Sequence, residues 1–249
     1  MTNTQLFNEA LKRGLRAGYF DVETSPVLVW TYSTHDVYIP HGQIEQDKKI
    51  TSVAWMFEGE KKPHILEWGK KRDDKPMLTE AVKVLNSADI LIGQNSDGFD
   101  IKTIQWRLNV LRLPPLNNVT SIDTLKLSRK AFLGSSHTLD YRSRVYDLGG
   151  KIKQDMDNCI AVAKGDRKQQ AIRMIYNIKD VLDLREIFWK ELDYTVLPKY
   201  LVNMLHLFIK NKTPEFCIKC ASRKQARYNV TQVKNYMNCD NCGHRWRVN

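Results

Sequence analysis

Apolar residues in the first quarter of the chain come in short stretches that suit β-strands. The stretch AGYFDVET, at residues 17–24, combines an apolar run with two acidic residues at its end. Three further stretches rich in Val, Ile, Trp and Tyr follow it at residues 27–33, 48–59 and 61–68. Their lengths, and the turn residues between them, predict four strands in an antiparallel meander.

From residue 76 onwards the spacing of apolar residues becomes helical. Residues 76–88 follow this spacing and begin with a Pro, which suits a first helical turn. The short apolar run DILIGQN, at residues 89–95, is instead typical of a strand that is covered on both faces. The further elements predicted are a helix over 99–113, a strand over 119–124 and a long helix from about Arg167 to Leu192. Strands first, and then strands alternating with helices, indicate an α/β fold with a three-layer core and a mixed sheet.

Size and charge favour a globular protein with a polyanionic partner. The 249 residues are enough for one sizeable core and a small appendage. The formal net charge of +11 favours nucleic acid as the partner, and a basic surface that only aids solubility is the alternative. No stretch has the roughly 18 apolar residues that a membrane span needs, so we expect no membrane contact. The first twenty residues lack the apolar centre of a secretion signal, so we expect a cytoplasmic protein.

Four of the five cysteines form two close pairs near the end of the chain. Cys217 and Cys220 make one pair, Cys239 and Cys242 make the other, and eighteen residues separate the pairs. This spacing lies in the range for four thiolates that hold one structural Zn²⁺. Two disulfides are the alternative, which an intracellular location disfavours. We expect Cys159 to be a small buried core residue.

The last quarter of the chain carries most of the basic excess. Residues 190–249 contain eleven Lys or Arg and four Asp or Glu, and Tyr228, Tyr236 and Trp246 lie among them. Cations with exposed rings suit a single-stranded nucleic acid, although such rings also build the small core of a zinc ribbon. We therefore expect an α/β domain over 1–192, a basic connecting segment over 193–216 and a four-cysteine zinc ribbon over 217–249.

Acidic residues occur in three contexts that suit metal binding. Asp21 and Glu23 are two residues apart on a predicted strand, so they point to the same face. Neighbouring carboxylates repel each other unless a cation binds between them. Asp100 opens a predicted helix, where the helix dipole also favours an acidic residue, and Tyr176 and Asp180 share one face of the longest predicted helix. Each pattern alone is weak, and their combination carries the prediction.

Together these residues resemble the DEDD (DnaQ-like) family of 3′–5′ exonucleases, which has a ribonuclease H-like fold. The stretch FDVET is similar to the first family motif, NSDGFD to the second and YNIKDV to the third. The second motif is similar to that of proofreading domains in family B polymerases, and residues 121–140 resemble a segment of related stand-alone nucleases. Tyr176 corresponds to the Tyr subgroup, because the His subgroup has a His where this chain has Ile175. The resemblance covers roughly residues 17–190.

The resemblance implies hydrolysis of phosphodiester bonds with two bound Mg²⁺ or Mn²⁺ ions. Asp21 would bridge both ions, and Glu23 and Asp180 would complete the site on the side of the nucleophile. Asp100 would help to hold the other ion, partly through water. Hard divalent cations prefer such oxygen ligands, so the residue types agree with the implied chemistry.

The resemblance also implies roles for three residues beside the metal ligands. Tyr176 would position the attacking water, because a phenol with an ordinary pKa of about 10 is a poor base at neutral pH. Asn95 and Phe99 would shape the slot for the terminal nucleotide, although for Phe99 core packing is the preferred interpretation.

Several functions on the same fold stay open at this point. The favoured substrate is a single-stranded 3′ end, with DNA preferred over RNA. A structure-specific endonuclease or resolvase would use the same carboxylates, and a non-catalytic protein would only bind nucleic acid. A proofreading module would need a separate polymerase, or another replication or repair protein, as its partner.

Overall fold

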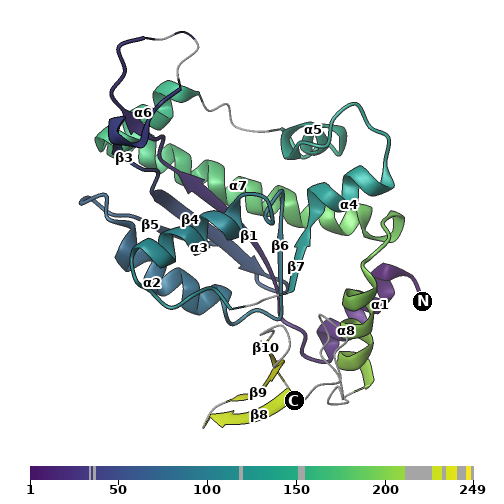
Figure 1. Cartoon of the computed structure of the whole chain (residues 1–249). Coiled ribbons are helices and arrows are strands. Elements are labelled where there is room, and N and C mark those ends of the chain that lie inside the picture. The colour runs from purple at the N-terminus through teal and green to yellow at the C-terminus, as the bar shows by residue number, and fades with distance from the viewer. Residues whose placement is uncertain are drawn as a thin grey trace.

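A five-stranded sheet forms the centre of the computed structural model (Figure 1). The strand order is β5-β4-β1-β6-β7. The strands are β1 (Ala17–Thr24), β4 (Ile50–Phe57), β5 (His64–Glu67), β6 (Ile90–Gly93) and β7 (Thr120–Asp123). The structure describes residues 1–33, 35, 38–117, 120–150 and 155–210, and the backbone of residues 226–231, 234–239 and 245–247.

Both strand directions occur in this sheet. β1 pairs antiparallel with β4 and parallel with β6, while β4 and β5 are antiparallel and β6 and β7 are parallel. All four residues of β6 are buried, as expected for an apolar strand in the parallel part of a covered sheet. The mixed α/β sheet confirms the predicted fold class and is consistent with a ribonuclease H-like core.

Alternate side chains of β1 enter two cores, one on each face of the sheet. Tyr19 belongs to the core beneath α7 (Arg167–Glu191). Its neighbour Phe20 belongs to the core beneath α2 (Asp74–Leu85) and α3 (Asp100–Val110). The two-residue period of a strand explains this division, and it gives the three layers seen in Figure 1.

Two helices near the ends of the described core extend the layer that contains α7. α1 (Asn3–Lys12) and α8 (Lys199–Lys210) contact each other, and Phe7, Leu201 and Leu205 are fully buried. α8 lies within the segment expected from its basic residues to be a connection. Its apolar residues recur at helical spacing, so this part of the segment packs with the central domain.

Buried ion pairs fix the orientation of several helices. Arg142 donates two hydrogen bonds of 2.9 and 2.6 Å to Glu191 at the end of α7. Arg107 of α3 donates two of 2.7 Å to Asp74 in the first turn of α2. The two-pronged geometry resists rotation of either partner. The remaining helices are α4 (Thr124–Ala131), α5 (Leu139–Val145), α6 (Met156–Lys164) and two 3-10 helices at His41–Gln43 and Leu192–Tyr194.

The stretch at residues 27–33 is not a strand of the central sheet. Within it only β2 (Leu28–Val29) is extended, and it pairs with β3 (Ile44–Gln46) in a separate two-stranded sheet. β1 pairs directly with β4, so the predicted meander was wrong at this point. Leu28 and Trp30 are exposed, which explains the difference, because this segment has the composition of a strand without a layer to cover it.

A separate three-stranded antiparallel sheet lies near the end of the chain. It consists of β8 (Ala226–Thr231), β9 (Lys234–Cys239) and β10 (Arg245–Arg247) in the order β10-β9-β8. Cys239 is the last residue of β9, whereas Cys217, Cys220 and Cys242 lie outside the described residues. The zinc site therefore stays a prediction. Within the described part of the chain, no helix is long and apolar enough to cross a membrane.

Candidate active site

The second half of β1 brings two carboxylates close to a third one on α7. Asp21 and Glu23 share one face of β1, as the strand period predicts. Oxygen atoms of Asp21, Glu23 and Asp180 all lie within 4.8 Å of one another. Asp180 is buried and the other two are half-buried. The first and third motifs therefore meet in a group of carboxylates that can bind a metal ion.

The face of α7 that meets the sheet carries Asn177 one turn before Asp180. Its Nδ2 donates a hydrogen bond of 2.5 Å to Oδ2 of Asp21. Its Oδ1 accepts one of 3.0 Å from the hydroxyl of Ser52 on β4. Asn177 is fully buried, so these two bonds hold the carboxylate of Asp21 in one orientation.

Arg173, one further turn back on α7, places a positive charge beside Glu23. Its Nη2 lies 2.5 Å from Oε2 of Glu23 and donates to the carbonyl of Thr24 at 3.0 Å. Its Nη1 donates to Sγ of Cys159 at 2.7 Å. Cys159 is half-buried and contacts a cation, so the expectation of a buried core residue was wrong. Neither Arg173 nor Asn177 was identified from the sequence.

Asp100 begins α3 and is buried beside the same strand. Its Oδ1 accepts a hydrogen bond of 3.0 Å from the backbone N–H of Val22, which lies between Asp21 and Glu23. Burial raises the pKa of Asp100 to about 7; backbone hydrogen bonds oppose this rise, and the negative charges of Glu23 and Asp123 add to it. The second motif thus reaches the first through a backbone contact, while Asp100 lies outside the group of three ligand oxygens.

Asn95 occupies a tight loop between β6 and α3. Its φ of 58° is left-handed, a conformation that Asn tolerates better than most residues. Its N–H donates to Oδ1 of Asp123 at 3.0 Å, and its carbonyl accepts from the N–H groups of Gly98 and Phe99.

Phe99 is 36% exposed, so core packing is wrong as its explanation. Nζ of Lys48 lies 5.5 Å from the centre of the Phe99 ring.

A cavity of about 520 Å³ opens beside the carboxylates. Asp21, Asn95 and Asp180 line it, so the structure brings these three predicted residues to one cavity. Tyr176 lies one turn before Asp180 on α7 and is half-buried. Much of the remaining wall comes from α4, the loop that precedes α5 and the first residue of α5, and these residues are Leu125, Arg129, Ser136, His137, Thr138 and Leu139. The only sequence signal for that wall was the similarity of residues 121–140 to related nucleases.

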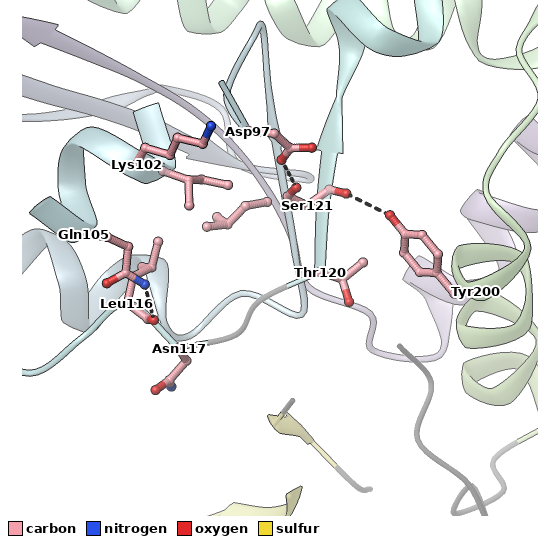
Figure 2. Close-up of a pocket in the computed structure, with 10 residues that line it drawn as sticks. Asp97, Lys102, Gln105, Leu116, Asn117, Thr120, Ser121 and Tyr200 are labelled. Carbon is pink, nitrogen blue, oxygen red and sulfur yellow. Dashed lines mark hydrogen bonds between the residues drawn. The ribbon is translucent and has the colours of Figure 1, made fainter. Parts of the chain in front are cut away.

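A second hollow of about 490 Å³ lies along β7, between α3 and α8 (Figure 2). There the hydroxyl of Tyr200 donates to the carbonyl of Ser121 at 3.4 Å, and the hydroxyl of Ser121 donates to Asp97. Asp97 is the one acidic residue among the described residues of this lining, and it is paired with Lys126. The hollow therefore lacks a group of metal ligands among those residues, and the carboxylate cavity is the better candidate site.

Comparison with known proteins supports the fold. No protein-family model and no curated protein sequence matches the chain. Among solved structures, the family B DNA polymerase from the hyperthermophilic archaeon Pyrobaculum calidifontis is similar, with a TM-score of 0.51 and 14% sequence identity. The match covers 78% of this chain and 27% of the polymerase chain. At this level of identity the likeness concerns the fold alone.

Proposed function

We propose that this chain is a metal-dependent 3′–5′ exonuclease that hydrolyses phosphodiester bonds of nucleic acid, with DNA as the favoured substrate. The observation that carries the proposal is the convergence of Asp21, Glu23 and Asp180 from two distant parts of the chain. The three motifs in order support the same activity. The fold similarity to a family B DNA polymerase agrees with it, because the second motif resembles that of proofreading domains.

The donor set suits Mg²⁺ or Mn²⁺. All three ligand groups are carboxylates, the oxygen donors that hard divalent cations prefer. Their oxygen atoms lie within 4.8 Å of one another, so their charges repel when no cation is bound. When bound, two divalent ions would supply a nucleophilic water at neutral pH and neutralise charge on the phosphate and the leaving oxygen.

Different residues of this chain would hold the two ions. Asp21 would contribute to both ions, while Glu23 and Asp180 would complete the site on the side of the nucleophile. Asp100 would act from the buried side of β1, next to the backbone N–H of Val22. Asn177 would keep Asp21 in its orientation through the hydrogen bond of 2.5 Å.

Four further residues would handle the substrate. Tyr176 would orient the attacking water, and Arg129, which lines the same cavity as Asp21, would attract a phosphate of the bound strand. Asn95 and Phe99 would shape the slot for the terminal nucleotide. Asn95 lines the cavity, and Phe99 leaves part of its ring exposed for a base.

Degradation of 5′-labelled oligonucleotides tests the proposal. Single- and double-stranded DNA and RNA are incubated with Mg²⁺ or with EDTA. We expect products shortened step by step from the 3′ end, in Mg²⁺ only. Asp21→Ala should abolish them without unfolding the protein, whereas Glu80→Ala, on the exposed side of α2, should cleave like wild type.

The same assay separates the competing functions. Cleavage of a circular or 3′-blocked single strand would indicate an endonuclease instead. Binding without cleavage under every condition would indicate a non-catalytic nucleic-acid-binding protein. A wild-type rate in Asp21→Ala would place the catalytic site elsewhere in the chain.

A further inference from the structure

The connection between β1 and β4 is much longer than its geometry requires. Antiparallel neighbours are commonly joined by two to five residues, yet residues 25–49 separate these two strands. This segment, here called the arm, contains β2, the 3-10 helix at His41–Gln43 and β3. It extends beyond the arrowhead end of β1, the strand that carries Asp21 and Glu23 (Figure 1). Chain connectivity alone does not account for it.

The described residues of the arm present large side chains to solvent. Trp30 is 69% exposed, Tyr38 is 83% exposed and Tyr32 is fully exposed. Leu28 is also exposed, and it lies two residues before Trp30 in the sequence. Single exposed apolar residues are ordinary, but several in one short segment mark an interaction surface.

The last residues of the arm include Asp47 and Lys48, and these two contact residues next to the candidate active site. Nζ of Lys48 lies 5.5 Å from the centre of the Phe99 ring. Oδ2 of Asp47 accepts a hydrogen bond of 3.1 Å from Nε1 of Trp106 on α3. Phe99 directly precedes Asp100, and both Phe99 and Trp106 keep part of their rings exposed. The arm therefore lies against the helix that brings Asp100 to the site.

We propose that the arm binds the single-stranded part of the nucleic acid whose 3′ end enters the active site, with bases stacked on Trp30 and Tyr32. This proposal rests on the proposed function. Every base has a π-face, so exposed rings bind single strands with little regard to sequence. Lys48, a residue of the arm beside Phe99, would attract a phosphate, and the net charge of +11 adds long-range attraction to a polyanion.

The position of the arm favours the substrate itself as the occupant. Seven residues lead from Glu23 to Trp30, which is at most roughly 25 Å of fully extended chain. Trp30 is therefore within a few nucleotides of the carboxylates. Lys48 contacts the Phe99 ring, so a nucleic-acid strand that leaves the cavity past Phe99 meets this residue of the arm first.

Binding measurements without turnover test the arm separately from catalysis. The anisotropy of a fluorescein-labelled oligo(dT) strand is titrated with the full chain in buffer without added divalent ions. Trp30→Ala and Tyr32→Ala should each weaken binding about fivefold or more, and the double variant further. Tyr32→Phe should bind like wild type, because it keeps the ring. Tyr194→Ala, which removes a ring 74% exposed on the 3-10 helix at Leu192–Tyr194, is the matched control.

Two results would overturn the proposal. One is equal affinity of the Trp30→Ala/Tyr32→Ala double variant and Tyr194→Ala. The other is a change from dimer to monomer in sedimentation of the double variant with unchanged nucleic-acid affinity, which would make a second copy of the chain the occupant. The exonuclease proposal fails differently. If the wild type never cleaves but the arm variants bind oligo(dT) more weakly, the arm proposal stands and the exonuclease proposal fails.

Discussion

Asn177 acts on the candidate site through Asp21 and lies outside the group of metal-ligand oxygens. Asn177→Ala should lower the exonuclease rate roughly ten- to a hundredfold and raise the Mn²⁺ concentration needed for half-maximal rate, because partners of metal ligands orient them. Ser52→Ala removes the donor to Asn177 and should shift both quantities in the same direction by less. Initial rates over a Mn²⁺ series measure both. An unchanged metal dependence in Asn177→Ala would reduce this residue to a packing role.

Tyr176, the neighbour of Asn177, is predicted to act on the attacking water. Tyr176→Phe removes one oxygen atom, so the fold and the affinity for an oligonucleotide should persist. The single-turnover rate should fall by about ten- to a thousandfold if that oxygen positions the water. Tyr194→Phe makes the same chemical change on an exposed ring and should cleave at the wild-type rate. Equal rates in the two variants would contradict a role for the Tyr176 hydroxyl.

Asp100 makes the stability of the metal-free protein depend on pH. Burial raises its pKa to about 7 from an ordinary value of 3.8, so the folded chain binds this proton more tightly than the unfolded chain. The resulting stabilisation is fully present below about pH 4 and is lost as the pH rises towards 7.

Asp100→Asn stays neutral and keeps an oxygen that can accept from Val22. At pH 7.5 it should raise the free energy of unfolding above that of wild type, by up to roughly a few kcal/mol. At pH 4 the free energies of unfolding of wild type and Asp100→Asn should differ little, since the side chain at position 100 is then neutral in both folded proteins. The comparison at pH 4 is the control. Urea unfolding of metal-free protein at both pH values measures the difference. A difference that does not change with pH would contradict the link to Asp100.

At the scale of the element, strong periodic patterns made α7 and β6 predictable. The sequence placed α7 at about Arg167–Leu192 and the structure has Arg167–Glu191, because a capping Asp166 and a long helical pattern define it. The strand at residues 27–33 was wrong, since its composition suits a sheet but no layer covers it. The segment that contains α8 was interpreted from its basic residues as a connection, whereas its apolar residues recur at helical spacing and are buried.

The candidate site was predictable where a local motif marks it. Asp21, Glu23 and Asp180 each lie in a short motif, and the structure brings them together. Asn177 and Arg173 are also on α7, but their roles depend on which side chains of the sheet they meet. The spacing of residues along α7 does not reveal these partners, because they depend on how α7 packs on β1 and β4.

The buried pair between Arg142 and Glu191 should matter more for stability than an exposed pair on the same helix. Glu191→Ala leaves Arg142 buried without its carboxylate partner and should destabilise the fold by about 3–5 kcal/mol. Arg167 and Glu67 form an exposed pair of similar geometry, so Glu67→Ala should cost about 1 kcal/mol or less. Urea unfolding of both variants compares them. Equal losses would show that the buried pair does not lock α5 to α7.

At the scale of the whole molecule, most of the basic excess lies in the last quarter of the chain, away in sequence from the candidate site. The carboxylates of the candidate site come from the first 180 residues, whereas residues 190–249 hold eleven basic and four acidic residues. A polyanion would therefore be attracted by one part of the chain and cut by another. Such a division predicts that the two parts can be impaired independently.

The four cysteines allow that independence to be tested. A segment of about 33 residues is too short to fold on an apolar core alone, so we expect one tightly bound zinc per chain, separate from the catalytic ions. Cys239→Ser should remove this zinc and leave the central domain folded, while Cys159→Ser, outside the two pairs, should keep it. Metal analysis of the purified proteins measures the content. Native protein without zinc would end the zinc hypothesis.

The consequence of losing that zinc should appear in nucleic-acid binding and not in the chemical step. Cys239→Ser should bind oligonucleotides more weakly, and the slope of log affinity against log salt should flatten by roughly one unit for each phosphate that the variant no longer neutralises. Cleavage at saturating substrate should change little, because every proposed catalytic residue lies at or before Asp180. Affinity over a salt series for wild type and Cys239→Ser measures the slope. An identical slope would mean that this segment does not touch nucleic acid, and docking of another protein would then explain its basic surface better.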